Sequence, residues 1–235
     1  MSVLQHSITY LRARPFPALL AVAAGFLLTA SERLVDPDTW PRFPFEAAWA
    51  ISLLYLGYTA IVDIHRAMST SHEGDVPERF AVPSYLVRAV PVLLCFSFLS
   101  AFAESAVASF SELSITTRFF LSLFVPAFVG SLLWALSGQW IMSAIVYGTS
   151  SGFAFRGSSR FFPLIATLLL INLVIPLTDL FFIYSHPQSD AVRIGQVVVR
   201  QGCLIICQIV SVAVVVRVFL TAHSGTSHQI SRRWL

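Results

Sequence analysis

Three ionisable residues stand inside long apolar runs of this chain: Glu104, Asp179 and Arg200. A charge placed in hydrocarbon is costly, so each of these residues is a candidate for a binding or transport site. Asp179 and Arg200 lie at comparable distances on either side of the turn at 185–191, on segments that run in opposite directions. We therefore expect an ion pair between them, which would clamp the two segments together.

A polar cavity is the alternative interpretation of the same charges. It would open toward the end of the bundle near the turn at 185–191, and it would bind a small polar molecule or a lipid headgroup. Its expected lining is Glu104, Asn172, Asp179 and Gln201. The charged candidates fall toward one end of their segments, where long side chains can reach the membrane interface.

A second pair of candidates, Arg156 and Arg160, lies in the short connector within the stretch 147–173. Glycines and serines make this connector a poor helix interior, and phenylalanines flank the two arginines. Arginine binds phosphate bidentately, so the pair would contact lipid headgroups or dock a partner protein. The alternative is that both arginines only anchor the connector at the cytoplasmic interface, as positive loops commonly do.

No catalytic set accompanies these charges. The sequence has no Gly-x-Ser-x-Gly elbow, no His-Glu-x-x-His motif and no Gly-rich phosphate loop with a lysine. The three cysteines all lie in apolar runs, where a thiol behaves as a small hydrophobe. His65, His72 and Asp75 lack a recognised spacing of metal ligands. We therefore expect a protein that is not an enzyme and that holds no cofactor and no metal.

The composition indicates a membrane protein. Hydrophobic residues make up 56% of the 235 residues and charged residues 11%, whereas soluble domains carry about 25% charged residues. The net charge of +3 is small and scattered along the chain, which argues against a nucleic-acid partner.

Six apolar segments approach or exceed the length of about 20 residues that crosses a bilayer as a helix. They lie at 16–35, 45–64, 86–108, 119–147, 161–184 and 192–220. We expect the first to be a retained span, because a cleavable signal peptide would need a small residue at the position of Leu28. The expected fold is an all-α, polytopic integral membrane helix bundle, with residues 1–235 forming a single membrane domain.

Arginine placement predicts the orientation of these spans. With the N-terminus in the cytoplasm, ten of the fifteen arginines fall on the cytoplasmic side and five on the far side. Positive residues are concentrated on the cytoplasmic side of membrane proteins. We therefore expect both termini in the cytoplasm and the chain in the plasma membrane, which in a bacterium is the inner membrane.

The order of several short motifs suggests a family. After the second span, His-Arg-Ala at 65–67 precedes Glu-Gly-Asp-Val-Pro at 73–77. Arg88 leads into the third span, and a connector that begins Ser-x-Phe-x-Phe-Arg-Gly and ends in an aromatic pair occupies 151–162. Over about 45–173, this order resembles the YciC-like bacterial inner-membrane proteins and, through them, the membrane domain fused to some glycerophosphodiester phosphodiesterases. The resemblance implies six membrane helices in a bacterial inner membrane and predicts no reaction.

Two functions remain open from the sequence. The first is a non-catalytic membrane protein that organises or assists lipids or protein partners in the bacterial envelope. The second is a small transporter or channel subunit whose polar site includes Glu104, Asp179 and Arg200. The expected partners are membrane lipids and either another membrane protein or a second copy of the chain.

Overall fold

The computed structural model describes residues 2–34, 42–69, 78–109, 114–147, 158–184 and 190–231. Within these ranges the chain is almost entirely helical and contains no β-strand. The helices are α1 (Val3–Ala13), α2 (Pro15–Leu34), α3 (Arg42–Ser69), α4 (Glu78–Ser109), α5 (Ile115–Tyr147), α6 (Ser158–Asn172), α7 (Val174–Tyr184) and α8 (Asp190–Ser231). The expected all-α bundle is confirmed.

Five of the described helical stretches are long and apolar enough to cross a membrane. They are Phe43–Ser69, Val82–Val107, Thr116–Ile145, Phe161–Phe182 and Val192–Thr221. A sixth candidate requires α2 to be taken together with α1, although the two helices are bent by 85°. The lengths and composition are those of a multi-pass membrane protein, and the first expected span coincides with α2.

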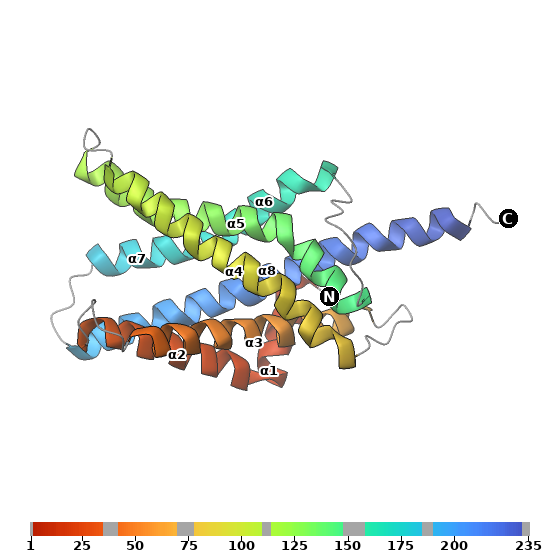
Figure 1. Ribbon diagram of the computed structural model, residues 1–235, viewed down its shortest axis with the longest axis horizontal. Helices are drawn as coiled ribbons and strands as arrows, with labels where there is room; N and C mark the ends of the chain where they lie inside the picture. The colour runs from red at the N-terminus through yellow and green to blue at the C-terminus, as the bar shows by residue number, and fades with distance from the viewer. Residues whose placement is uncertain are drawn as a thin grey trace.

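The bundle is organised around α8 (Figure 1). α2 packs against α3, α4 packs against α5, and α8 contacts α1, α2, α3, α5, α6 and α7. Ile205, Ile209, Val212 and Val216 of α8 are at most 2% exposed. Their spacing of four, three and four residues gives one buried stripe along the helix. Many outward side chains are also large and apolar, as in α4, where Val87 and Phe98 are 72% and 71% exposed. Lipid-facing surfaces are apolar in this way because the surrounding solvent is hydrocarbon.

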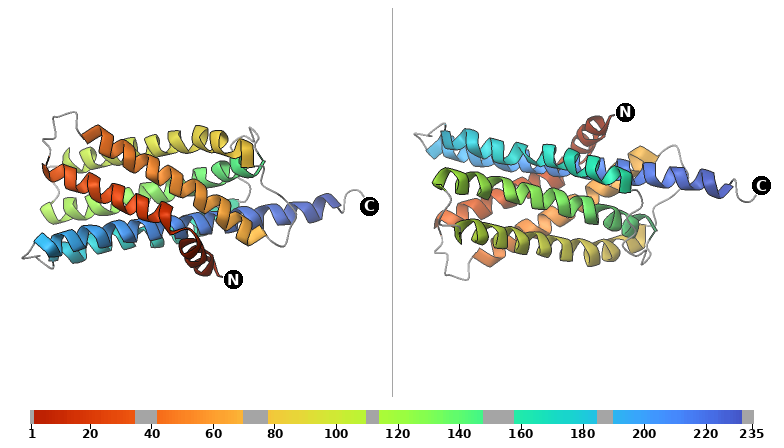
Figure 2. Two further views of the ribbon diagram at one scale, coloured as in Figure 1. Left: turned by 90° about the horizontal axis from the view of Figure 1, so that it is seen from below. Right: turned by 90° about the horizontal axis from the view of Figure 1, so that it is seen from above.

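The first residues of the chain form a separate short helix, which lies outside the six segments expected from the sequence. In α1, Ser2 and Gln5 form a reciprocal capping box that satisfies two backbone N–H groups at the helix start. Arg14 leaves the helical conformation because the residue before a proline disfavours it, and Pro15 then begins α2. This single non-helical residue produces the sharp turn between α1 and the bundle (Figure 2).

The second span is longer than expected, because α3 continues through Asp63 and His65 to Ser69 instead of ending near residue 64. The sequence suggests an end here because charged residues usually leave the membrane. In the structure, Asp63 Oδ2 lies 2.7 Å from Arg14 Nε, and His65 is 5% exposed. Asp63 is therefore paired and His65 is covered by the surrounding helices, so neither residue ends α3.

The fifth span is interrupted at Leu173, where α6 gives way to α7. Pro176 has no N–H for the carbonyl of Asn172, and its ring crowds that carbonyl. The N–H groups of Leu173 and Leu177 still donate to Leu169 and Leu173 across the break, at 2.8 and 3.2 Å. The two helices therefore continue as one irregular span.

Candidate functional site

The Asp179–Arg200 contact expected from the sequence is present between α7 and α8. Arg200 Nε donates to Asp179 Oδ1 at 2.6 Å. The Asp179 side chain is 17% exposed and that of Arg200 is 42% exposed. Pairing neutralises both charges, so neither has to be solvated alone among apolar helices.

This ion pair lies on the wall of a groove of about 520 Å³ between α3, α4, α5, α7 and α8. Pockets that hold small molecules commonly have volumes of about 300 to 1,000 Å³. Most of the lining is apolar and comes from several helices. It includes Leu53, Val92, Phe96, Leu133, Trp134 and Leu204.

Two prolines beside this groove each leave one backbone carbonyl without its usual helical partner. Pro126 and Pro176 both line it, as do Ser122 and Asn172, the residues four positions before each proline. A proline has no N–H, so the carbonyls of Ser122 and Asn172 cannot receive the usual helical hydrogen bond. The Asn172 side chain is itself fixed by donating from Nδ2 to Ser131 Oγ at 2.9 Å.

The expected polar cavity is only partly correct. Asp179 and Asn172 line the groove, but Gln201 is buried on the other side of α8, where Nε2 lies 3.4 Å from both Gly25 O and Thr29 Oγ1 of α2. Successive residues of a helix are about 100° apart, so Gln201 points away when Arg200 points to α7. α2 approaches Gln201 closely at Gly25, because a Cβ there would be 2.5 Å from Gln201 Oε1 and the Gln201 side chain would have to shift.

The remaining predicted residues are less fully described. Glu104 belongs to α4 and Arg160 to α6, but their side chains lie outside the described part of the structure. Arg156 lies outside the described residues altogether. Their proposed roles as a polar-site residue and as headgroup contacts stay predictions.

Arg88 is a buried cation that was not among the candidates expected from the sequence. It is 7% exposed, its Nη1 donates to Trp140 O and to Ser143 Oγ (2.9 Å to the latter), and its guanidinium lies 5.0 Å from the Trp140 ring centroid. The available signal was its position among apolar residues on both sides. It was assigned only to the start of a span, and its partners lie on α5, far along the chain.

Chemically, the groove can bind a molecule that has one charged part and one apolar part. Among the described residues, no three His, Cys, Asp or Glu side chains gather as a metal site would need. Comparison with protein families, with curated proteins and with solved structures finds no match.

Proposed function

We propose that this protein is a non-catalytic multi-pass membrane protein that holds one amphipathic lipid in the groove between α3, α4, α5, α7 and α8. The observation that carries this proposal is the distribution of polarity in the groove: a charged pair on an otherwise mostly apolar wall. A lipid has the same distribution, with one charged end and a hydrocarbon chain.

The length of the groove supports a chain-like ligand. Its lining on α4 extends from Tyr85 to Ser97, which is about 18 Å at 1.5 Å per helical residue. Asp179 lies near the end of α7 and Tyr85 near the start of α4, so the two mark opposite ends of the bundle. A hydrocarbon chain would run from the ion pair along α4 toward Tyr85.

The ion pair favours a zwitterionic headgroup. Arg200 offers guanidinium donors to a phosphate, and Asp179 offers a carboxylate to an ammonium group. A headgroup with both charges can replace the Asp179–Arg200 contact with two new ones. A ligand with a single charge would leave one member of the pair without a partner in an apolar surrounding, which is unfavourable.

We further propose a bacterial inner membrane as the location, with both termini in the cytoplasm. The ten-to-five distribution of arginines and the resemblance to YciC-like proteins support this assignment. In this orientation, Asp179 and Arg200 lie toward the outer leaflet.

The test is the amount of lipid that the purified protein retains. Ala127→Phe places a large ring in the groove, which Ala127 lines, and Ala101→Phe makes the same change at an exposed position of α4. Native mass spectrometry and lipid extraction should show one lipid fewer in Ala127→Phe than in the natural protein and in Ala101→Phe. Equal retention in all three proteins would contradict a lipid in the groove.

A small transporter or channel subunit is the second candidate function. The observation that favours it is a series of polar groups at two depths: the ion pair, then Asn172 and Gln208, which lie about 10 to 12 Å further along their helices. Proteoliposomes with the natural protein would take up a small polar solute, and Ala127→Phe would abolish this uptake, if this function is right. Retained lipid without any flux would support the lipid-holding function.

A further inference from the structure

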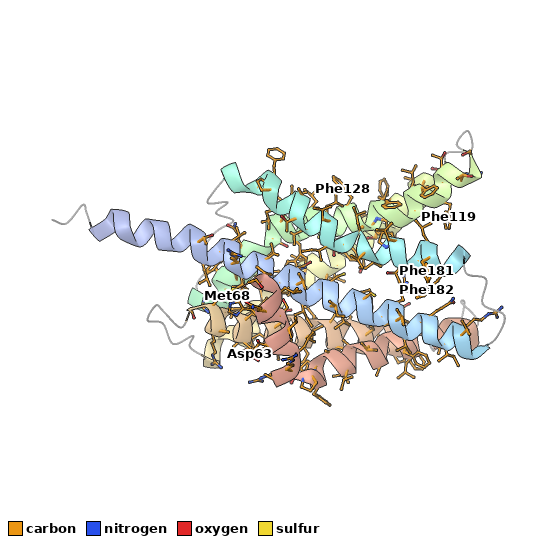
Figure 3. All side chains as sticks on the ribbon, turned by 180° about the vertical axis from the view of Figure 1, so that it is seen from behind. Asp63, Met68, Phe119, Phe128, Phe181 and Phe182 are labelled. Atoms are coloured by element: carbon orange, nitrogen blue, oxygen red, sulfur yellow. The ribbon has the colours of Figure 1, made fainter. Side chains whose placement is uncertain are left out.

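A second cavity, of about 430 Å³, lies at the end of the bundle opposite the Asp179–Arg200 pair, where α1 crosses α3 and α8. Its lining consists of Val3, His6, Ala67, Met68, Arg217, Leu220 and Thr221. Figure 3 shows Met68 and Asp63 of α3 beside this crossing. We name this cavity the α1 pocket.

The α1 helix has three distinct sides. Ser7 and Tyr10 are buried against the bundle, and Tyr10 Oη lies 2.7 Å from Thr59 Oγ1. Leu4 and Ile8 form an apolar side that is exposed, at 57% and 41%. The third side is polar and exposed, and it carries Gln5, Thr9 and Arg12.

These sides have a defined direction relative to the membrane. The His6 side faces Ala67 and Met68, which lie beyond Thr59 toward the end of α3 and of the bundle. Leu4 and Ile8 are about 160° from His6 around the helix, so they face back toward the apolar part of the bundle. Since α1 also lies at 85° to α2, it has the geometry of a helix lying in the membrane surface.

The α1 pocket therefore lies at the depth of lipid headgroups, and its charge is positive. Arg217 is exposed, and among the described residues no carboxylate pairs with it. The buried His6 Nδ1 has no hydrogen-bond partner among the described residues. Burial and the nearby Arg217 lower the pKa of His6, so at pH 7 the imidazole is neutral.

We propose that the α1 pocket binds the phosphate-bearing headgroup of an anionic membrane lipid, with Arg217 and His6 as the contacting residues. Arg217 supplies charge-assisted donors to the phosphate, and the neutral His6 supplies one N–H donor. Leu220 and Met68 line the remainder, next to the glycerol and first acyl carbons. This site is separate from the groove, because the two share no lining residue.

The test is lipid-dependent thermal stability of the full chain in detergent. Phosphatidylglycerol is titrated against the natural protein, Arg217→Gln, Arg217→Lys and Arg193→Gln, the last being a matched exposed arginine near the start of α8. Loss of a charged hydrogen-bonding partner should raise the half-saturating lipid concentration by about tenfold in Arg217→Gln. Arg217→Lys should lose less, and Arg193→Gln should behave as the natural protein does.

Two further titrations identify the ligand. Phosphatidylcholine has no net charge and inorganic phosphate has no acyl chains. Phosphatidylcholine also fits the groove, so we expect it to stabilise the natural protein and Arg217→Gln alike, and we expect inorganic phosphate to stabilise neither as phosphatidylglycerol stabilises the natural protein. If Arg217→Gln weakened the stabilisation by either one as much as it weakens that by phosphatidylglycerol, the assignment to an anionic lipid would be overturned. An unchanged half-saturating concentration in Arg217→Gln would overturn the assignment to the α1 pocket.

Discussion

Two arginines show how this bundle keeps a cation among apolar helices. Arg200 has a carboxylate partner and remains 42% exposed. Arg88 is 7% exposed and is held by a backbone carbonyl, a serine hydroxyl and the face of a tryptophan. The first arrangement leaves the charge accessible to a ligand, whereas the second satisfies the guanidinium with neutral groups. Arg200 is therefore suited to binding, and Arg88 to holding α4 against α5.

A double-mutant cycle tests the Asp179–Arg200 pair. Asp179→Asn and Arg200→Gln each leave one unpaired charge, and each should lower the free energy of unfolding in detergent by about 1 to 3 kcal/mol, less than for a fully buried pair. The double variant should recover part of the loss. Thermal denaturation gives the values, and strict additivity of the two single effects would argue against a coupled pair.

For Arg88, shape should matter as much as charge. Arg88→Lys keeps the charge but loses the planar group that lies over Trp140 and the forked donors. We expect both Arg88→Lys and Arg88→Leu to lower the thermal midpoint. Ser143→Ala removes one of the hydrogen bonds and should cost about 1 kcal/mol. A lysine variant as stable as the natural protein would show that charge alone is sufficient.

The two cations also show what the sequence can specify. Only five residues separate the end of α7 from the start of α8, which limits the relative depth of Asp179 and Arg200, so counting residues predicted their contact. Arg88 contacts residues 52 and 55 positions later. No turn fixes that register, because it depends on how α4 and α5 pack along their whole length.

At the scale of elements, apolar length was the reliable signal. The five long spans were predicted to within several residues, because a run of about twenty apolar residues is typical of a membrane-spanning helix. The α1 helix was missed because it has only 11 residues and carries polar groups on two sides. The extension of α3 was missed because Asp63 is paired with Arg14, the residue between α1 and α2, which lies far from it in the sequence. In both cases the deciding partner lies elsewhere in the chain.

The close approach of α5 to α8 depends on Gly138. A Cβ at this position would lie 2.7 Å from Val215 Cγ1, and inserting a group into a packed interface costs about 1 to 3 kcal/mol. Gly138→Ala should therefore lower the thermal midpoint in detergent. Gly195→Ala in α8 is the matched control, because nothing lies within 4 Å of its added Cβ. Equal midpoints for the two variants would show that the helices can separate without cost.

Placement of α1 in the membrane surface can be measured with spin labels. In a variant without native cysteines, a label at Leu4 should collide with lipid-soluble oxygen, and a label at Thr9 with a water-soluble nickel chelate. Both positions are exposed, and they lie about 140° apart around the helix. Similar collision rates for both reagents at the two positions would mean that α1 projects into water.

At the scale of the whole molecule, the six spans expected from the sequence predict the side on which each connector lies. Reporters fused after Arg156 and after Leu235 should both read cytoplasmic, and a reporter fused after Asp190 should read external, because the arginines favour this orientation. Alkaline phosphatase and green fluorescent protein fusions give the two readings. Identical readings for the Arg156 and Asp190 fusions would require a different number of spans.

α8 is also long enough to extend out of the membrane into the aqueous phase. The helix has 42 residues, about 63 Å at 1.5 Å per residue, whereas the hydrocarbon of a bilayer is about 30 Å thick. Its last turns extend past the other helices toward the C-terminus (Figure 1). A rigid domain joined without a linker after Ser231 would inherit the tilt of this helix. Such a fusion would act as a fiducial marker, enlarging a 25.9 kDa particle and fixing its orientation for electron cryomicroscopy.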